Sequence, residues 1–399
     1  MNILTLSTVF PNPTEVNFGL FVRARLQHMA ESASIRVMAP VPLMNYRMRK
    51  TQFRPQIPLQ REDGKLTVYH RRWVYPPMGG VFNAFFLFLQ TLGIALRLNR
   101  EAPVDIIDSH FAHPDGIAAA LLALVLHLPF TVTLRGNETL HGSFRLRRAA
   151  MAWALRRAAR VITVSEALRQ YAISLGCAPD RVKTIPNGVD VSIFHTRPEG
   201  AIALPRVIFS AGYLIQRKGY DRLIRAVAAL RDHGIECELR IAGGTGGETA
   251  YEAELHRLVT EFGLEESVHF LGAVPPARLA KLMSEAGVFC LASSREGWPN
   301  VVHEAQACGA PVVATDIGGV PEMIPSREYG FVIPAGDQKA LEEALAEALT
   351  TQWDRRRIAQ WGQSRSWHKV AQEVLELFAE VVDKRTAMLT TVNSGSLEK

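Results

Sequence analysis

Short apolar, β-branched runs alternate with helical patterns along most of the chain. Because these runs are almost continuously apolar, they are typical of parallel strands buried on both faces of a sheet. Right-handed crossovers through the intervening helices then predict two doubly wound α/β domains. The expected strands are residues 2–10, 34–40, 66–72, 104–110, 130–136, 160–165, 181–186, 206–212, 236–244, 267–272, 287–293 and 310–315.

A segment rich in Pro, Gly and turn residues, 186–205, separates the two sets of strands and predicts a linker. We expect an N-terminal domain over 1–190 and a C-terminal domain over 200–360. Helical patterns continue to about residue 385, and a helix over about 365–385 is expected to complete the first domain. Ligands of such sheets bind beyond the carboxyl ends of the strands, so a cleft between the domains is the expected site.

Residues 81–98 are aromatic and apolar, although Asn83, Gln90 and Arg97 interrupt the run. A run of about 18 residues is at the short edge for a membrane-spanning helix. We interpret it as a buried or partly exposed helix of the first domain. A face that contacts a membrane surface stays open as the alternative.

Composition is that of a globular protein, with 48% hydrophobic and 21% charged residues. The four cysteines show no metal-ligand spacing, and we interpret them as reduced thiols of a cytoplasmic protein. Charge is divided unevenly: residues 1–199 carry 24 Lys and Arg against 13 Asp and Glu, a net of +11, and residues 200–399 carry a net of −5. The basic half suggests an anionic partner such as a lipid phosphate, a membrane surface or nucleic acid, with a solvated arginine-rich surface as the alternative.

Candidate chemistry is concentrated in SREGWPNVVHEAQACGAPVV, residues 294–313. Glu296 follows an expected strand, and Pro299 and Asn300 are typical of a helix start. Backbone N–H groups at such a start suit a phosphate or sugar oxygen. Glu304 in the first turns can accept two hydroxyls of a diol such as a ribose, and Glu296 can hold a second polyol. The alternative is a helix-terminal carboxylate beside a surface glutamate.

Residues 294–324, SREGWPNVVHEAQACGAPVVATDIGGVPEMI, resemble the donor-binding segment of family 4 glycosyltransferases. Further stretches follow in the family's order: NFGLFVRARLQHMA, HFAHPDGIAA, TVTLRGNE, VSEAL, IPNGVD, RKGYDRLIRA and FLGAV. The resemblance implies the GT-B fold, an α/β architecture of two Rossmann-like domains facing each other across a cleft. The branch it most resembles includes enzymes of teichuronic-acid and exopolysaccharide assembly.

The resemblance also implies roles in donor binding. Glu304 would hold the nucleotide ribose, and Glu296 would hold hydroxyls of the transferred sugar. The backbone of the loop between them would help: Gly297, Trp298, Pro299 and Asn300. Lys218, beside Gly212 of the donor loop, would neutralise the diphosphate, because a departing nucleoside diphosphate builds negative charge.

In the first domain, Gly19 matches the loop that approaches the diphosphate, where a residue without Cβ lets the backbone come close. His110 stands where the family places a histidine near the donor sugar, and His113 is the alternative if the register shifts. For either histidine a structural role is an equal alternative.

Departures from the family pattern add two expectations. Tyr213 replaces an arginine of the donor loop, and Arg217 is expected to compensate. Arg135 precedes Gly136 where the family has histidine, which could add a cation on the acceptor side. A glycine cluster at 242–247 invites a dinucleotide reading, but the third glycine of that fingerprint would fall at Thr249.

The implied activity is transfer of a hexose-type unit from a nucleotide-sugar donor to a glycan or lipid-linked acceptor in cell-surface polysaccharide biosynthesis, with retention of configuration. No metal, cofactor or nucleic acid is expected, and the enzyme is expected in the cytoplasm, with peripheral association to an anionic inner membrane. The alternatives are another GT-B sugar-nucleotide enzyme, such as an epimerase or phosphorylase, and a non-catalytic sugar-nucleotide-binding protein.

Overall fold

A computed structural model describes residues 1–42, 57–76, 79–196 and 204–396. They form two compact units. Unit 1 comprises Met1–Asn187 and Trp367–Lys399, and unit 2 comprises Gly188–Ser366. Residues 197–203 of the expected linker lie outside the described residues. Each unit is described by itself below.

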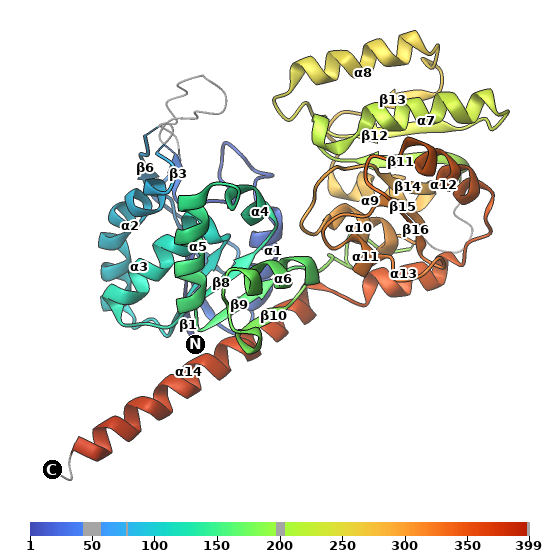
Figure 1. The fold of residues 1–399 in the computed structure, drawn as a ribbon. Coiled ribbons are helices and arrows are strands. Elements are labelled where there is room, and N and C mark those ends of the chain that lie inside the picture. The colour runs from blue at the N-terminus through green and yellow to red at the C-terminus, as the bar shows by residue number, and fades with distance from the viewer. Residues whose placement is uncertain (43–56, 77–78, 197–203, 397–399) are drawn as a thin grey trace. The chain divides into compact units, whose positions relative to one another are not determined.

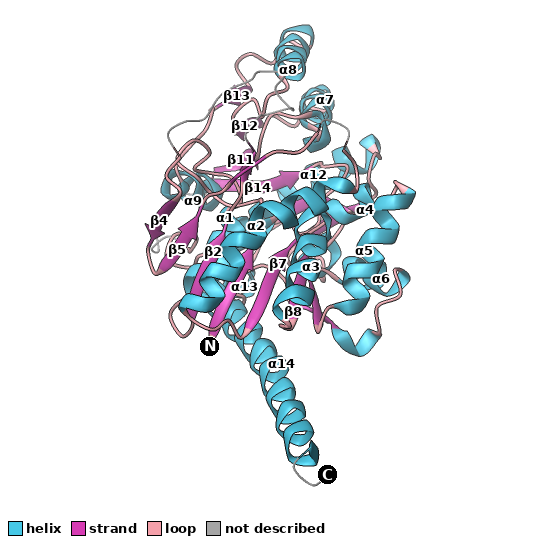
Figure 2. Cartoon of the chain, turned by 90° about the vertical axis from the view of Figure 1, so that its left-hand side faces the viewer, coloured by secondary structure: helices cyan, strands magenta, loops and turns pink. Residues whose placement is uncertain are grey.

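Unit 1 holds a parallel sheet between helices (Figure 1, Figure 2). Its strands are β1 Asn2–Leu6, β2 Ser34–Met38, β3 Val41–Pro42, β4 Gln60–Asp63, β5 Leu66–Tyr69, β6 Arg72–Trp73, β7 Ile106–His110, β8 Phe130–Leu134, β9 Arg160–Thr163 and β10 Val182–Thr184. Its helices and helical turns are α1 Leu20–Met29, α2 Phe82–Glu101, η2 Ala112–Gly116, α3 Ile117–Leu126, α4 Asn137–His141, α5 Arg145–Arg157, α6 Glu166–Ser174, η3 Pro179–Arg181 and α14 Trp367–Ser396.

Among the described residues the main sheet has eight strands in the order β10-β9-β8-β7-β1-β2-β5-β4, and β3 pairs with β6 separately. Side chains alternate between the two faces of a strand, and Ile35 and Val37 of β2 point to the same face. There they join a core that includes Leu26 of α1 and Val374 and Phe378 of α14. Figure 1 shows α14, the last helix of the chain, beside the first elements of the unit.

One strand of this sheet departs from the expected pattern. β4 pairs with β5 in the antiparallel direction, and Gly64 and Lys65 form the two-residue turn between the strands. Gly64 has φ +61°, a backbone conformation that glycine adopts readily. A two-residue loop that begins with glycine is a hairpin signal, and the expectation of parallel strands alone overlooked it.

Unit 2 is also built around a parallel sheet. Its strands are β11 Leu204–Ala211, β12 Glu238–Ala242, β13 Val268–Phe270, β14 Ala286–Leu291, β15 Val312–Thr315 and β16 Gly330–Ile333. Its helices and helical turns are η4 Gln216–Lys218, α7 Tyr220–Asp232, α8 Thr249–Glu261, α9 Pro276–Glu285, α10 Asn300–Ala307, α11 Val320–Met323, α12 Gln338–Thr350 and α13 Arg355–Gln363. The described strands lie in the order β13-β12-β11-β14-β15-β16, and α7, α8 and α12 share a core on one face.

Both sheets contain a point where the strand order reverses. In unit 1 the chain builds outward from β1 through β2 on one side and from β7 through β8 on the other. In unit 2 the same reversal separates β11 from β14. Open α/β sheets bind ligands outside the carboxyl ends of the strands at such a point. The loops after β1 and β7, and those after β11 and β14, are therefore where binding residues belong.

The apolar run at 81–98 forms helix α2. Among the described residues it is the one helix long and apolar enough to cross a membrane, a test that core helices of soluble proteins also pass. Leu87, Ile94 and Leu98 are buried, whereas Phe82 is 65% exposed. The helix therefore has one face in the core of unit 1 and another that is uncovered.

Candidate active site

A cluster of two cations and one carboxylate lies at the reversal point of unit 2. Lys218 ends the short turn η4 after β11, and Glu296 lies in the loop after β14. The Lys218 Nζ lies 2.7 Å from Glu296 Oε1, and Arg217 Nη1 lies 2.8 Å from the same oxygen. Ser293 Oγ donates a third hydrogen bond to it at 3.1 Å. The structure thus brings Glu296 to Lys218, 78 positions earlier in the sequence, and to the adjacent Arg217.

These charges are only partly removed from solvent. The Arg217, Lys218 and Glu296 side chains are 33%, 12% and 13% exposed. Burial by itself would raise the pKa of Glu296, but the adjacent Lys218 and Arg217 charges lower it to a net value below the usual range. The carboxylate is therefore ionised at neutral pH, and the two cations still offer N–H groups to an incoming anion.

The loop that carries Glu296 is supported from behind by a glycine turn. Gly319 N donates to Gly297 O at 2.9 Å. Gly318 has φ +53°, and a Cβ there would lie 2.3 Å from the Glu296 carbonyl oxygen. Only glycine lets the two backbones approach this closely. The sequence DIGG after β15 thus fixes the conformation of the candidate donor loop.

Helix α10 begins at Asn300, directly after Pro299, as the sequence predicts. Glu304 lies in its second turn and is half-buried. Burial, with a contribution from the Asp190 carboxylate, raises the pKa of Glu304 to about 7. The carboxyl group is therefore about half protonated at neutral pH, a property typical of carboxyl groups at functional sites.

Trp298, in the same loop, is 9% exposed and packs edge-on against His303 with ring centroids 5.6 Å apart. Its indole Nε1 has no hydrogen-bond partner among the described residues. Buried N–H groups are nearly always paired, so the packing of the loop by itself does not account for this donor.

The glycine cluster at 242–247 has a packing role. A Cβ on Gly243 would lie 1.8 Å from the Gly212 carbonyl oxygen, and one on Gly246 would meet Tyr213. The cluster therefore lets the loop after β12 pack against the donor loop after β11. Tyr213 is 54% exposed. Because residue 213 is not an arginine, Arg217 is the arginine next to Lys218 in this loop.

In unit 1, Gly19 precedes α1 with φ +78°, and a Cβ there would lie 2.5 Å from the Val9 carbonyl oxygen. The loop after β1 is thus tightly folded around a position that requires glycine. A second contact holds its start: Thr8 N donates to Asp115 Oδ2 at 2.9 Å, and Thr8 Oγ1 lies 3.2 Å from the same oxygen. Burial raises the pKa of Asp115 to about 8.

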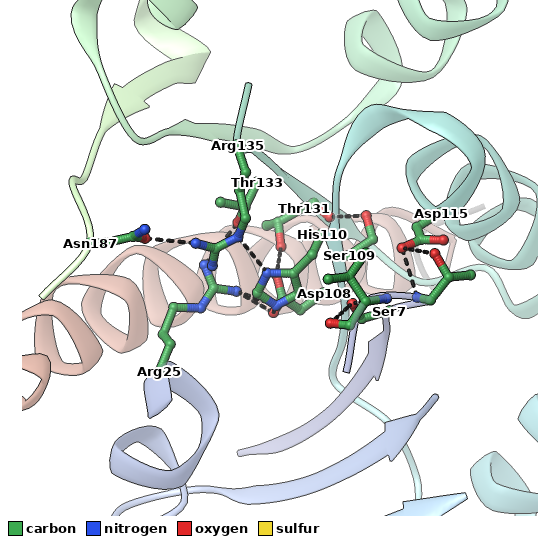
Figure 3. Close-up of polar contacts among 12 residues, drawn as sticks. Ser7, Arg25, Asp108, Ser109, His110, Asp115, Thr131, Thr133, Arg135 and Asn187 are labelled. Atoms are coloured by element: carbon green, nitrogen blue, oxygen red, sulfur yellow. Dashed lines mark hydrogen bonds and ion pairs between the residues drawn. The ribbon is translucent and has the colours of Figure 1, made fainter. Parts of the chain in front are cut away.

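A sealed polar cluster lies beneath the reversal point of unit 1 (Figure 3). Arg25 Nη2 donates to Asp108 Oδ2 at 2.5 Å, and Arg25 Nη1 donates to Thr133 Oγ1 at 2.8 Å. The other Asp108 oxygen accepts from Thr131 Oγ1 at 3.1 Å. Arg25 and Asp108 are 2% and 0% exposed, so both charges are removed from solvent and compensate each other.

His110 is enclosed in this cluster. Its Nδ1 accepts from Arg135 Nε at 3.0 Å, and its Nε2 lies 3.3 Å from Asp108 Oδ2 and 3.0 Å from Arg25. Burial lowers the pKa of His110 to about 3, so the ring is neutral. Both ring nitrogens thus have partners inside unit 1, and a role beside the donor sugar stays a prediction.

Arg135 is also directed inward, where its Nη1 donates to Asn187 Oδ1 at 2.7 Å. Its expected contribution to the acceptor side likewise stays a prediction. His113, the alternative to His110, is 6% exposed and has an Nδ1 without a hydrogen-bond partner among the described residues.

Sequence reasoning overlooked Arg25, Asp108 and Asp115. The available signal was the occurrence of an aspartate within IIDSH, an otherwise buried strand, because a buried carboxylate demands a partner. No group of three or more His, Cys, Asp or Glu side chains with metal-site geometry occurs in the part of the chain that the structure describes. The requirement for a metal is not tested by that observation.

Comparison with known proteins places this chain in a family. Residues 195–365 match the family described as Glycosyl transferases group 1, and residues 51–193 match Glycosyltransferase Family 4. The chain belongs to the family 4 glycosyltransferases. It is an enzyme of the hexosyltransferase type with the GT-B fold. The suspected family and fold are thereby confirmed.

Named relatives of this glycosyltransferase include the teichuronic acid biosynthesis protein TuaC of Bacillus subtilis, 26% identical over 88% of each chain. The colanic acid biosynthesis protein WcaL of Escherichia coli is 32% identical over 43% of each chain. Among solved structures, HepE of Anabaena in complex with UDP aligns with a TM-score of 0.73 at 21% identity, covering 95% of this chain and 100% of that one. At this identity the likeness to HepE supports the fold alone.

Proposed function

We propose that this glycosyltransferase moves a sugar from a nucleotide-sugar donor to a glycan or lipid-linked acceptor during assembly of a cell-surface polysaccharide, with retention of configuration. The observation that carries the proposal is the convergence of Lys218 and Arg217 on Glu296 at the reversal point of unit 2. Fixed cations there would stabilise charge that develops on a departing diphosphate. The names of TuaC and WcaL support a polysaccharide product.

Unit 2 would bind the donor. Lys218 and Arg217 would pair with the diphosphate, and Glu296 would hold hydroxyls of the transferred sugar with the backbone of residues 297–300. Glu304, one helical turn further, would accept both hydroxyls of the ribose. Gly212 would allow the backbone of the loop after β11 to approach the diphosphate closely. Unit 1 would receive the acceptor.

A thermal-shift screen with UDP, GDP, ADP and their sugars tests donor binding, because a ligand that binds only the folded state raises the melting temperature. Glu304→Gln should then weaken the bound donor by about 1.5–3 kcal/mol, the usual loss for a hydrogen bond to a charged group. Glu343→Gln, on the exposed surface of α12, is the matched control. Equal donor affinity in the two variants by calorimetry would contradict the role of Glu304.

We further propose that Lys218 and Arg217 replace a divalent ion at the diphosphate, so that transfer proceeds without a metal. Activity should persist after treatment with EDTA. Complete loss that Mn²⁺ restores would show that the two cations are insufficient.

Peripheral association of unit 1 with the cytoplasmic face of an anionic membrane completes the proposal. Phe82, Phe85 and Leu89 recur along one side of α2 and are 65%, 48% and 49% exposed. An apolar stripe on a basic unit suits an anionic bilayer surface. Liposome flotation at low salt should recover the enzyme, and the triple serine variant should stay unbound. Failure of the unmodified enzyme to bind would refute this part.

A further inference from the structure

A cavity of about 470 Å³ opens within unit 1 and is not accounted for by the donor chemistry above. It is lined by Thr8 and Val9, which follow β1, and by Phe111 and His113, which follow β7. It therefore lies at the reversal point of the unit 1 sheet, where open α/β sheets bind their ligands. Trp73 of β6 and Asn83 of α2 also line it.

Three of the lining residues each carry a buried polar atom that has no hydrogen-bond partner among the described residues. The atoms are Trp73 Nε1, Asn83 Oδ1 and His113 Nδ1. Trp73 and His113 are 5% and 6% exposed, so these are buried groups, of which about 90% are normally paired. Three unpaired atoms from three separate elements around one cavity indicate a site built for a polar ligand.

The hydrogen-bonding character of each atom follows from its chemistry. An indole N–H is a donor only, and an amide oxygen is an acceptor. His113 Nε2 lies 3.2 Å from the Gly80 carbonyl oxygen, which requires the ring proton on Nε2 and leaves Nδ1 as an acceptor. The lining residues thus carry one unpaired donor and two unpaired acceptors, a set that hydroxyl groups can satisfy because each hydroxyl both donates and accepts.

Aromatic rings supply the remaining recognition surface. The Trp73 and Tyr75 rings lie 4.5 Å apart at 33°, and Phe111 packs edge-on against Phe21. Phe111 has φ +69°, a strained backbone position of a kind that concentrates at functional sites. Aromatic faces favour a ligand with an apolar ring face, and the hydroxyl-binding atoms favour a polar rim.

Charge distinguishes between classes of sugar. One carboxylate, Glu15, and one guanidinium, Arg147, line the cavity, so their formal charges balance. Burial, with His141 and Arg147 nearby, lowers the pKa of His113 to about 4, so this ring adds no charge at neutral pH. A site for a phosphate or a uronate would carry an excess of cations.

We propose that this cavity binds a neutral hexopyranose unit of the acceptor, with hydroxyls on Trp73 Nε1, Asn83 Oδ1 and His113 Nδ1 and the apolar ring face on the aromatic side chains. The assignment of this sugar to the acceptor rests on the proposed function, whereas its binding in the cavity does not.

The test is an NMR titration of the indole N–H resonances of the six tryptophans in ¹⁵N-labelled protein. Trp73→Phe identifies the Trp73 resonance by its loss, and Trp153→Phe, on α5 outside the cavity lining, is the matched control. Methyl glycosides of glucose, galactose and mannose, in both anomers, are titrated to 100 mM. At least one should shift the Trp73 resonance, and Asn83→Ala should weaken that binding about tenfold, the loss expected for one hydrogen bond.

Glucuronate and inorganic phosphate are titrated in parallel. If no neutral glycoside shifts the Trp73 resonance, or if only glucuronate or phosphate does, the proposal is wrong. The Trp298 resonance separates this outcome from failure of the proposed function. A nucleotide or nucleotide sugar that shifts Trp298 supports the donor site whatever Trp73 does, and a neutral glycoside that shifts Trp73 supports the cavity whatever Trp298 does.

Discussion

Each unit contains a cluster in which arginine meets a carboxylate, and the two clusters differ in access to solvent. In unit 1, Arg25 and Asp108 are at most 2% exposed, and Thr131 and Thr133 occupy their remaining hydrogen-bonding positions. In unit 2, Arg217 is 33% exposed and shares Glu296 with Lys218. A pair whose partners all lie inside the protein stabilises a fold, whereas one that keeps exposed N–H groups can exchange a partner for a ligand.

The same contrast holds for carboxyl groups that lack a cation. Asp115 in unit 1 is fully buried and holds the loop after β1 through Thr8. Glu304 in unit 2 is half-buried in the candidate donor site. Burial raises the pKa of both, to about 8 and about 7. The position of a carboxyl group relative to solvent, rather than its pKa alone, therefore separates a structural role from a binding role.

The largest expected effect is the destabilisation that follows when the buried pair of Arg25 and Asp108 is broken. Arg25→Met leaves the Asp108 charge buried without compensation and should destabilise the protein by about 3–5 kcal/mol. Arg23→Met, on the same helix, removes an ion pair to Asp63 from an arginine that is 41% exposed, and should cost under about 1 kcal/mol. Urea unfolding of both variants measures the difference. Equal stabilities would show that the cluster is not sealed as described.

The partly exposed pair of Arg217 and Glu296 should affect turnover instead of stability. Arg217→Ala removes one of two cations beside Glu296 and should lower turnover about 10²–10³-fold, the typical loss for one transition-state donor. The melting temperature should change little, and Tyr213→Phe should be milder. Steady-state transfer rates with an identified donor provide the measurement. Near-normal turnover in Arg217→Ala beside an inactive Lys218→Ala would show that the lysine acts without it.

Donor affinity should depend on pH through Glu304. A carboxyl with a pKa of about 7 is mostly protonated at pH 6 and mostly ionised at pH 8. If the ionised form accepts the ribose hydroxyls, affinity should be about tenfold weaker at pH 6, since one pH unit below the pKa leaves about a tenth of the group charged. Calorimetric titrations across this range should show the dependence in the native enzyme and its absence in Glu304→Gln.

The smallest effect concerns the stability of unit 1 as a function of pH. The folded pKa of Asp115, about 8, exceeds the usual value of 3.8, so the folded state binds the proton more tightly than the unfolded state does. This contribution to stability is complete below pH 3.8 and disappears as pH rises towards 8. Between pH 6 and pH 7 it should fall by about 1.4 kcal/mol. In Asp115→Asn the free energy of unfolding should depend less steeply on pH. Identical slopes in the variant and the native enzyme would show that Asp115 does not bind this proton.

The sequence predicted the features that depend on local pattern. Every expected strand overlaps a strand of the structure, and the helix start at Asn300 follows from Pro299 and the apolar spacing after it. The antiparallel β4 was missed because its four residues, QRED, carry no apolar pattern. β16 was missed as well, although GFVI is apolar.

Contacts between residues far apart in the sequence could not be predicted from local pattern. Arg25 and Asp108 are 83 positions apart, and nothing in either neighbourhood identifies the other. The sequence could nominate His110 as a ligand, but it could not reveal that Arg135 and Asp108 occupy both ring nitrogens. Trp73, Asn83 and His113 likewise come from three elements whose proximity depends on the completed fold.

The return of the chain to unit 1 has a consequence for biosynthesis. Val374 and Phe378 of α14 pack into the same core as Ile35 and Leu26, so unit 1 cannot bury that face until the ribosome has translated unit 2 and the helix that follows it. Unit 2, continuous from Gly188 to Ser366, can fold before the last helix of unit 1 has been synthesised. During synthesis the nascent first segment therefore exposes apolar surface that α14 covers later, and removal of α14 should leave that surface exposed in the finished protein.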